Sequence, residues 1–265
     1  MATREDDDSA AGRFVALLAV RDRLRDPGGC PWDREQTVST AKTFLLEEAF
    51  EAVEAADRED WPALCEELGD LLFQALFLAR IAADEGRFGD AEVLDGIREK
   101  LVRRHPHVFG EGRVSSSAEV LEVWGRAKQQ EKPERKSILD GVPRALPALL
   151  AAHRLQDKAR QVGFDWPTVQ GPQDKVREEH AELDQALQSG DRERIEAELG
   201  DLLFSLCNLG RHLGLEAEGA LRAANARFCR RFAAVEQGLR ERGRALDEAD
   251  LEEMDALWEA AKASE

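Results

Sequence analysis

Acidic residues recur at a fixed spacing in this chain. Glu48 and Glu51 lie three residues apart, and Glu67 and Asp70 repeat the spacing shortly afterwards. Residues three apart share a helix face, so each pair presents two carboxylates together. Oxygen ligands without His or Cys nearby suit a hard cation, Mg²⁺ or Mn²⁺, and argue against zinc. The pattern predicts a metal site, and the missing Glu-x-x-His motif disfavours a di-iron centre.

The segments that carry these acids read as two helices joined by a short turn. In the first, residues 42–57, Glu and apolar side chains take opposite faces. In the second, apolar residues follow Asp70 nearly all round the helix, so it should be buried. Buried carboxylates are costly unless they are paired or bind metal. We therefore expect the four carboxylates to converge, the alternatives being a solvated acidic face and acids placed at a helix N-terminus.

The whole arrangement occurs twice. Residues 67–73 read ELGDLLF, and residues 198–204 read ELGDLLF again, 131 positions later. The same offset carries Glu47, Glu48 and Glu51 onto three further glutamates. Such self-similarity indicates an internal duplication. The second acidic set consists of Glu178, Glu179, Glu182, Glu198 and Asp201.

The elements around both sets are predicted to be helical. Apolar residues recur at helical spacing in every long segment, and strand alternation is nearly absent, which indicates an all-α fold. Asp60 and Asp191 are predicted N-caps. Residues 131–147 mix charge, glycine and three prolines, which is typical of a connection. We expect two homologous domains, residues 1–140 and residues 141–265.

The net charge and composition limit which classes of binding partner are expected. The net charge is −17, which repels nucleic-acid polymers and anionic membranes, whereas a small anion remains possible beside a metal and a few cations. Four cysteines lie far apart without a CxxC motif, no apolar leader precedes the first helix, and the longest apolar run is too short to span a bilayer. We expect a cytoplasmic protein without membrane segments.

Several longer motifs resemble one family. GGCPWDREQT (28–37), LLEEAFE (45–51), RRHPHVFGE (103–111), VGFDW (162–166), both ELGDLLF segments and RRF (230–232) are similar to the MazG family of nucleoside triphosphate pyrophosphohydrolases. The resemblance implies helical domains with four-helix-bundle-type cores, completed by a second subunit in a homodimer. It also implies Mg²⁺-dependent hydrolysis of nucleoside triphosphates to monophosphate and pyrophosphate, with broad specificity suited to cleaning the nucleotide pool.

The resemblance also implies substrate contacts in the C-terminal half. Phosphate and base contacts would fall on Lys175, Arg194, Arg227, Arg231, Trp258 and Lys262. The first half has Phe44 and Ala63 where the second has Lys175 and Arg194, so we favour the second as the main active site. The second half departs too, because Ala197 stands where the first half has Glu66.

The mechanism that follows places Mg²⁺ on Glu179, Glu182, Glu198 and Asp201, with the equivalent ligands Glu48, Glu51, Glu67 and Asp70 in the first half. Water would attack the α-phosphorus and release pyrophosphate, and Glu178 would serve as general base or orient a ligand. The alternatives are a narrow-specificity pyrophosphohydrolase, acting for example on dCTP, dUTP or phosphoribosyl-ATP, and a helical nucleotide-binding scaffold without turnover. Zinc on His105 and His107 is disfavoured, because Pro106 breaks the helix between them.

Overall fold

A computed structural model describes residues 9–116, 119–120, 123–125, 131 and 136–264. Every regular element in these residues is a helix, so the predicted all-α class is confirmed. The chain divides into two compact units, Met1–Ala127 and Lys128–Glu265, called here the N-terminal and C-terminal units. The domain boundary near residue 140 stays a prediction, and residues 132–135 of the predicted connection lie outside the described residues.

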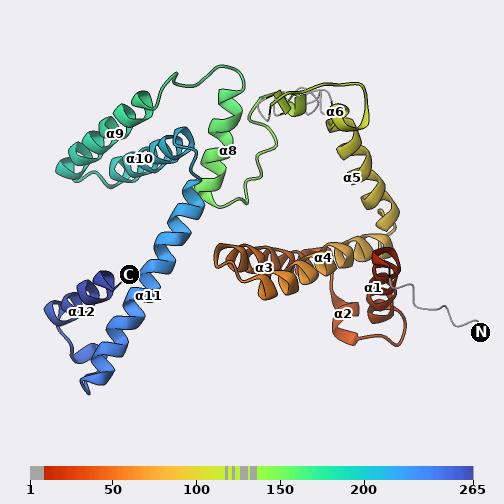
Figure 1. Ribbon diagram of the computed structural model, residues 1–265, viewed down its shortest axis with the longest axis horizontal. Coiled ribbons are helices and arrows are strands. Elements are labelled where there is room, and N and C mark those ends of the chain that lie inside the picture. The colour runs from red at the N-terminus through yellow and green to blue at the C-terminus, as the bar shows by residue number, and fades with distance from the viewer. Residues whose placement is uncertain (1–8, 117–118, 121–122, 126–130, 132–135, 265) are drawn as a thin grey trace, which may run out of the picture. The chain divides into compact units, whose positions relative to one another are not determined.

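The N-terminal unit is built around one antiparallel helix pair (Figure 1). It contains α1 (Ala10–Arg25), α2 (Pro31–Glu35), α3 (Val38–Asp57), α4 (Trp61–Asp84), α5 (Asp90–Arg104) and α6 (Pro106–Phe109). The pair is α3 and α4, and α1 packs against α4. Ala41, Phe77 and Ile81 form a buried cluster between the two helices of the pair.

Local signals explain where the helix pair begins and turns. Thr37 caps α3, because its hydroxyl accepts from the amide of Thr40 while the Thr40 hydroxyl accepts from the amide of Thr37. Asp60 caps α4 by accepting from the amide of Ala63 at 3.2 Å, as predicted. The turn between them passes through Glu59 at a positive φ of 54°. These caps set the register in which α3 faces α4.

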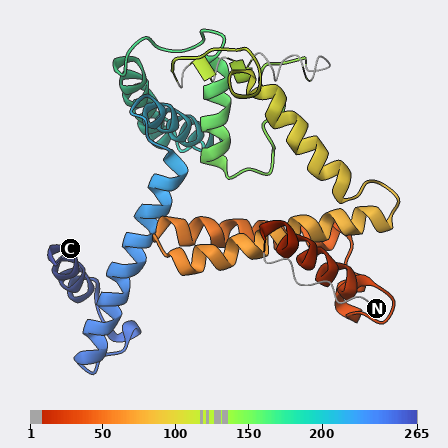
Figure 2. The same ribbon diagram turned by 45° about the vertical axis from the view of Figure 1, so that its right-hand side comes forward.

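The C-terminal unit repeats the helix pair. It contains α8 (Ala148–Arg160), α9 (Gln170–Ser189), α10 (Arg192–His212), α11 (Ala217–Glu241), a short 3₁₀ helix (Leu246–Glu248) and α12 (Leu251–Ala263). The views in Figures 1 and 2 both place α9 beside α10. Gly190 adopts a left-handed φ of 71° at the end of α9, and Asp191 then caps α10. The pair α9 and α10 therefore corresponds to α3 and α4.

Further helices cover this second pair. Helix α8 packs on α10, α11 contacts both α8 and α10, and α12 packs on α11. Cys207, Val235 and Leu239 are almost fully buried. All four cysteines are free thiols. In the part of the chain that the structure describes, no helix is long and apolar enough to cross a membrane.

Candidate metal and nucleotide site

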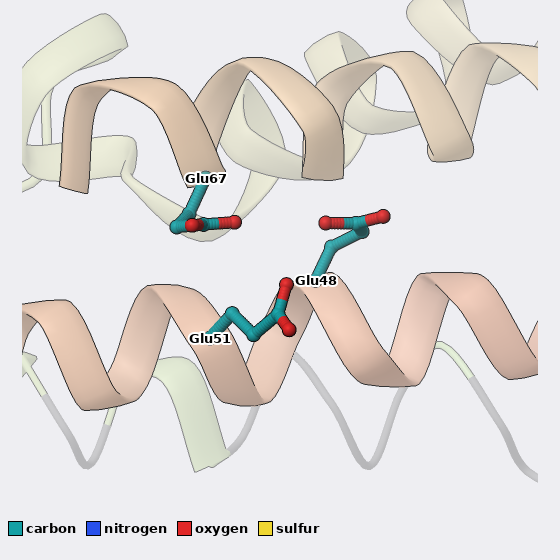
Figure 3. Close-up of side chains that lie close together, drawn as sticks. All are labelled: Glu48, Glu51 and Glu67. Atoms are coloured by element: carbon teal, nitrogen blue, oxygen red, sulfur yellow. The ribbon is translucent and has the colours of Figure 1, made fainter. Parts of the chain in front are cut away.

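The first acidic cluster lies between α3 and α4. Glu48 and Glu51 project from α3 toward Glu67 on α4, and one carboxylate oxygen of each lies within 4.8 Å of the others (Figure 3). Burial, and then the charges of Asp70 and Glu51, raise the pKa of Glu48. Burial and the charges of Glu51 and Glu48 likewise raise the pKa of Glu67. Three of the four carboxylates expected to converge thus form one group, whereas Asp70 lies outside it and acts on Glu48 through its charge. The group places like charges where a cation would be favourable.

The second cluster centres on Glu179. This residue is only 5% exposed, and its carboxylate belongs to two groups of acids. One group contains Glu178 and Glu182 on α9, the other contains Glu198 and Asp201 on α10, and in each group the carboxylate oxygens lie within 4.8 Å of one another. Burial and the charges of Glu179 and Glu198 raise the pKa of Glu182. The other four acids predicted for the C-terminal half therefore gather around the buried Glu179 carboxylate.

Two cations lie beside the second cluster. Lys175 Nζ lies 2.8 Å from Glu178 Oε1 and 2.5 Å from Glu179 Oε1, and these hydrogen bonds raise the pKa of the lysine. Arg194 Nε lies 3.6 Å from Glu198 Oε1. In the N-terminal unit, Phe44 takes the position of Lys175, and its ring lies 5.5 Å from that of Trp32. The difference between the two halves is thus a difference in cations at the rim of the acidic cluster.

A cleft of about 460 Å³ opens beside the second cluster, within the C-terminal unit. Glu179, Asp201 and Lys175 form part of its wall, and α8 and residues 164–166 supply much of the rest. Its other lining residues are Leu139, Leu155, Gln156, Ala159, Phe164, Asp165, Trp166, Phe204, Ser205, Asn208 and Arg211. Acids that can bind a cation therefore share one concave surface with aromatic and amide side chains, the arrangement typical of a small-molecule site.

Each half of the chain matches a known protein family. Residues 36–109 match the MazG nucleotide pyrophosphohydrolase domain, and residues 152–228 match phosphoribosyl-ATP pyrophosphohydrolase. The nucleoside triphosphate pyrophosphohydrolase of Escherichia coli K12 is 45% identical over 254 residues, covering 94% of this chain and 97% of that protein. The chain belongs to the MazG family.

Other members of the family agree with this assignment. The nucleoside triphosphate pyrophosphohydrolase/pyrophosphatase MazG of Thermotoga maritima is 42% identical over 250 residues, which cover 94% of this chain and 95% of that protein. An uncharacterized Bacillus subtilis protein, YabN, is 44% identical over 95% of this chain but only 52% of its own length. Enzymes of this family generally use a divalent metal, and the two matched regions contain the two acidic clusters.

The remaining substrate contacts implied by the MazG resemblance lie on α11 and α12. The Arg231 guanidinium lies 5.7 Å from the Trp258 ring centre, and Lys262 Nζ lies 3.2 Å from Glu259. Among the described residues, none of the set Arg227, Arg231, Trp258 and Lys262 lines the cleft. The structure thus groups Lys175 and Arg194 with the acids and places the other four elsewhere in the unit.

His105 and His107, the pair for which zinc binding is disfavoured, lie close together where α5 ends. His105 and His107 have ring centres 5.6 Å apart, and His105 Nδ1 lies 2.7 Å from the carbonyl oxygen of Leu101. Within the described ranges, neither histidine belongs to a group of three potential metal ligands. Among the described residues, the groups that could bind a metal ion therefore consist of carboxylates.

Asp165 anchors the wall of the cleft and was missed by the sequence analysis. Its Oδ1 lies 2.5 Å from Arg211 Nη2 and 2.8 Å from His212 Nε2. Burial alone would raise the pKa of Asp165, but the hydrogen bonds from Arg211 and His212 lower it to about 2. The VGFDW motif, noted only for its family likeness, was the signal that pointed to this residue. The ion cluster ties residues 164–166 to α10.

We expect Asp165→Asn to destabilise the protein by about 2 kcal/mol at pH 7, because the native pKa lies well below the ordinary value of 3.8. This stability is present above the unfolded-state pKa and is lost as the pH falls from about 4 to about 2. Urea denaturation between pH 7 and pH 3 measures it. A difference between the two proteins that stays constant over this range would contradict the assignment.

Proposed function

We propose that this chain hydrolyses nucleoside triphosphates to nucleoside monophosphate and pyrophosphate in dependence on Mg²⁺, with the C-terminal unit as the main active site. The observation that carries the proposal is the Glu179 cluster, which borders the cleft through Glu179 and Asp201. Lys175 contacts Glu179, and Arg194 contacts Glu198. The names of the relatives from E. coli and T. maritima support the reaction.

The residues present fit a hard divalent cation. In the part of the chain that the structure describes, the donor groups contain only carboxylate oxygens. The pKa of Glu182 is raised by burial and by the neighbouring carboxylates, whose repulsion a cation would relieve. Glu179, Glu182, Glu198 and Asp201 would hold Mg²⁺, and Mn²⁺ is the expected substitute. The ion would supply charge neutralisation for the triphosphate and a more acidic water.

The other side chains of the site would have separate roles in the reaction. Lys175 and Arg194 would exchange their carboxylate contacts for phosphate oxygens and so stabilise the leaving pyrophosphate. The Glu178 side chain is 57% exposed at the edge of the cluster, and it would accept the proton of the attacking water or orient a ligand. The water oxygen bonds to the α-phosphorus, and the bridging oxygen leaves with the β-phosphoryl group.

Product analysis tests the reaction. Purified protein is incubated with all NTPs and dNTPs and with phosphoribosyl-ATP, with and without Mg²⁺, and the products are separated by chromatography. We expect Mg²⁺-dependent monophosphate and pyrophosphate from many of these nucleotides, consistent with a cytoplasmic role in cleaning the nucleotide pool. Diphosphate and phosphate would contradict the mechanism. Turnover of one nucleotide would favour the narrow-specificity alternative, and nucleotide binding without turnover would favour the scaffold.

A homodimer is part of the proposal. Leu68 and Leu72 on α4 are half-exposed, as are Leu199 and Leu203 at the corresponding positions of α10. Apolar stripes at helical spacing normally face another element, so a second subunit would complete each bundle. Light scattering after size exclusion should give a particle of twice the 29.5 kDa chain mass. A particle of single chain mass at micromolar concentration would contradict this expectation.

A further inference from the structure

The segment that leads into α8 contains a tight turn, residues 136–140, called here the connecting turn. Asp140 Oδ2 accepts from the backbone amide of Lys136 at 2.9 Å and from that of Ser137 at 3.0 Å. Ser137 Oγ in turn accepts from the amide of Leu139 at 3.1 Å. Short polar side chains that bind nearby amides are typical of ordered turns. The connecting turn therefore has a defined local conformation.

A lysine on α8 attaches this turn to the helix. Lys158 Nζ donates to the backbone oxygen of Ile138 at 3.0 Å and to that of Asp140 at 3.1 Å. Hydrogen bonds from a charged donor are stronger than those between neutral groups. The two acceptors belong to the residues on either side of Leu139, so the ammonium group fixes the backbone of that residue. In both views the chain that leads into α8 runs back along this helix (Figures 1 and 2).

The residue between these two carbonyl groups lines the cleft beside the Glu179 cluster. Leu139 forms part of the cleft wall together with Leu155 and Ala159, which lie four residues apart on one face of α8. Among the described residues that line this cleft, Lys158 is not included. Lys158 can therefore shape the cleft through the turn that carries Leu139, without touching what the cleft holds.

The N-terminal unit has a different residue at the position of this lysine. Residues 23–26 read RLRD and residues 154–157 read RLQD, 131 positions apart, so Pro27 corresponds to Lys158. A proline side chain has no hydrogen-bond donor and cannot hold a turn in this way. The attachment is therefore a feature of the unit that we propose as the main active site.

We propose that Lys158 is a positioning residue of the active site, which holds the connecting turn so that Leu139 closes one side of the substrate cleft. This inference rests on the proposed function, because Glu179 and Asp201 line the same cleft. Leu139 would offer the bound nucleotide an apolar surface, while the acidic cluster and its cation would carry out the chemical step. It follows that the connection between the two halves contributes directly to substrate binding.

Lys158→Met tests this role, because methionine keeps an unbranched side chain of similar length and removes the donor. We expect KM for ATP in pyrophosphate release to rise about fivefold or more and kcat to stay within about twofold, since the wall acts in binding. Lys158→Arg keeps a charged donor and should hold KM within about twofold of the wild-type value. Arg160→Met, the matched control, removes a charge that pairs with Asp157 on the same helix and should change neither constant.

A double-mutant cycle shows whether Lys158 acts through Leu139. Leu139→Ala alone should raise KM by a factor similar to that of Lys158→Met. The double variant should then lie within about twofold of either single variant, whereas independent effects would multiply to about 25-fold. Hydrogen exchange at the amides of Leu139 and Asp140 should also become faster in Lys158→Met and remain unchanged in Arg160→Met.

Three results would overturn the positioning role: an unchanged KM in Lys158→Met, a loss confined to kcat, or multiplicative effects in the double variant. If ATP yields no pyrophosphate, the proposed function fails, and calorimetric affinities for α,β-methylene ATP, which cannot release pyrophosphate, then decide the positioning role. Weaker binding in both single variants, without further loss in the double variant, would support it. Equal affinities of the wild-type protein and Lys158→Met would refute it, and no binding by the wild-type protein would refute both proposals.

Discussion

Asp201→Asn is expected to lower pyrophosphate release by at least about 100-fold, because even outer-shell partners of a metal typically contribute 10- to 100-fold. Asp201 shares a group of carboxylates with Glu179 and Glu198, and it also lines the cleft. Asn keeps the size of the side chain and removes the charge that a hard cation requires. Asp201 is exposed, so the fold should tolerate the change.

Asp70→Asn is the matched control, because Asp70 stands 131 positions earlier in the other ELGDLLF segment. It should keep more than half of the wild-type rate, since the N-terminal unit has Phe44 and Ala63 where the C-terminal unit has Lys175 and Arg194. Steady-state kinetics on the full chain compare the two variants. A large loss in Asp70→Asn with a normal rate in Asp201→Asn would move the active site to the N-terminal unit.

The acidic clusters were predictable because their geometry is local. Residues three apart share a helix face, and a short turn brings Glu48 and Glu51 opposite Glu67 without any long-range information. Because the sequence is duplicated, the same geometry is expected around Glu179.

The structure also shows how the two halves differ at the position of Glu66, which Ala197 occupies in the second half. Among the described residues, Glu66 lies outside the group formed by Glu48, Glu51 and Glu67, and the Glu179 group forms without an acid at residue 197.

The cleft was not predictable in the same way. Gln156 meets Phe204 across 48 residues, and Asp165 meets Arg211 across 46. These contacts depend on how α8 and residues 162–169 pack on α10, which helical periodicity does not specify. A lone glutamine in an amphipathic helix carries no distinguishing spacing. The arrangement of Arg231 with Trp258 likewise depends on how α12 packs against α11, which family resemblance does not specify.

Removal of divalent metal is expected to abolish pyrophosphate release and to lower the melting temperature. Glu48, Glu67 and Glu182 all have a raised pKa because burial and neighbouring carboxylates disfavour their charged forms. A cation bound between the helices offsets this repulsion, and it binds the folded chain in preference to the unfolded chain. At a hundredfold excess over its Kd, such a ligand stabilises by about 2.7 kcal/mol, which corresponds to about 5 °C or more.

The experiment treats the protein with EDTA, removes the chelator by dialysis and measures residual metal. Activity should return with Mg²⁺ or Mn²⁺, whereas Zn²⁺ should restore little, because the ligand groups contain no His or Cys. The thermal shift should shrink when Asp201→Asn removes one ligand and shrink further when Asp70→Asn is added, since each unit contributes one acidic cluster. Full activity at a metal content far below the protein concentration would contradict the proposed mechanism. In that mechanism a cation held by the Glu179 cluster is required to neutralise the charge of the triphosphate.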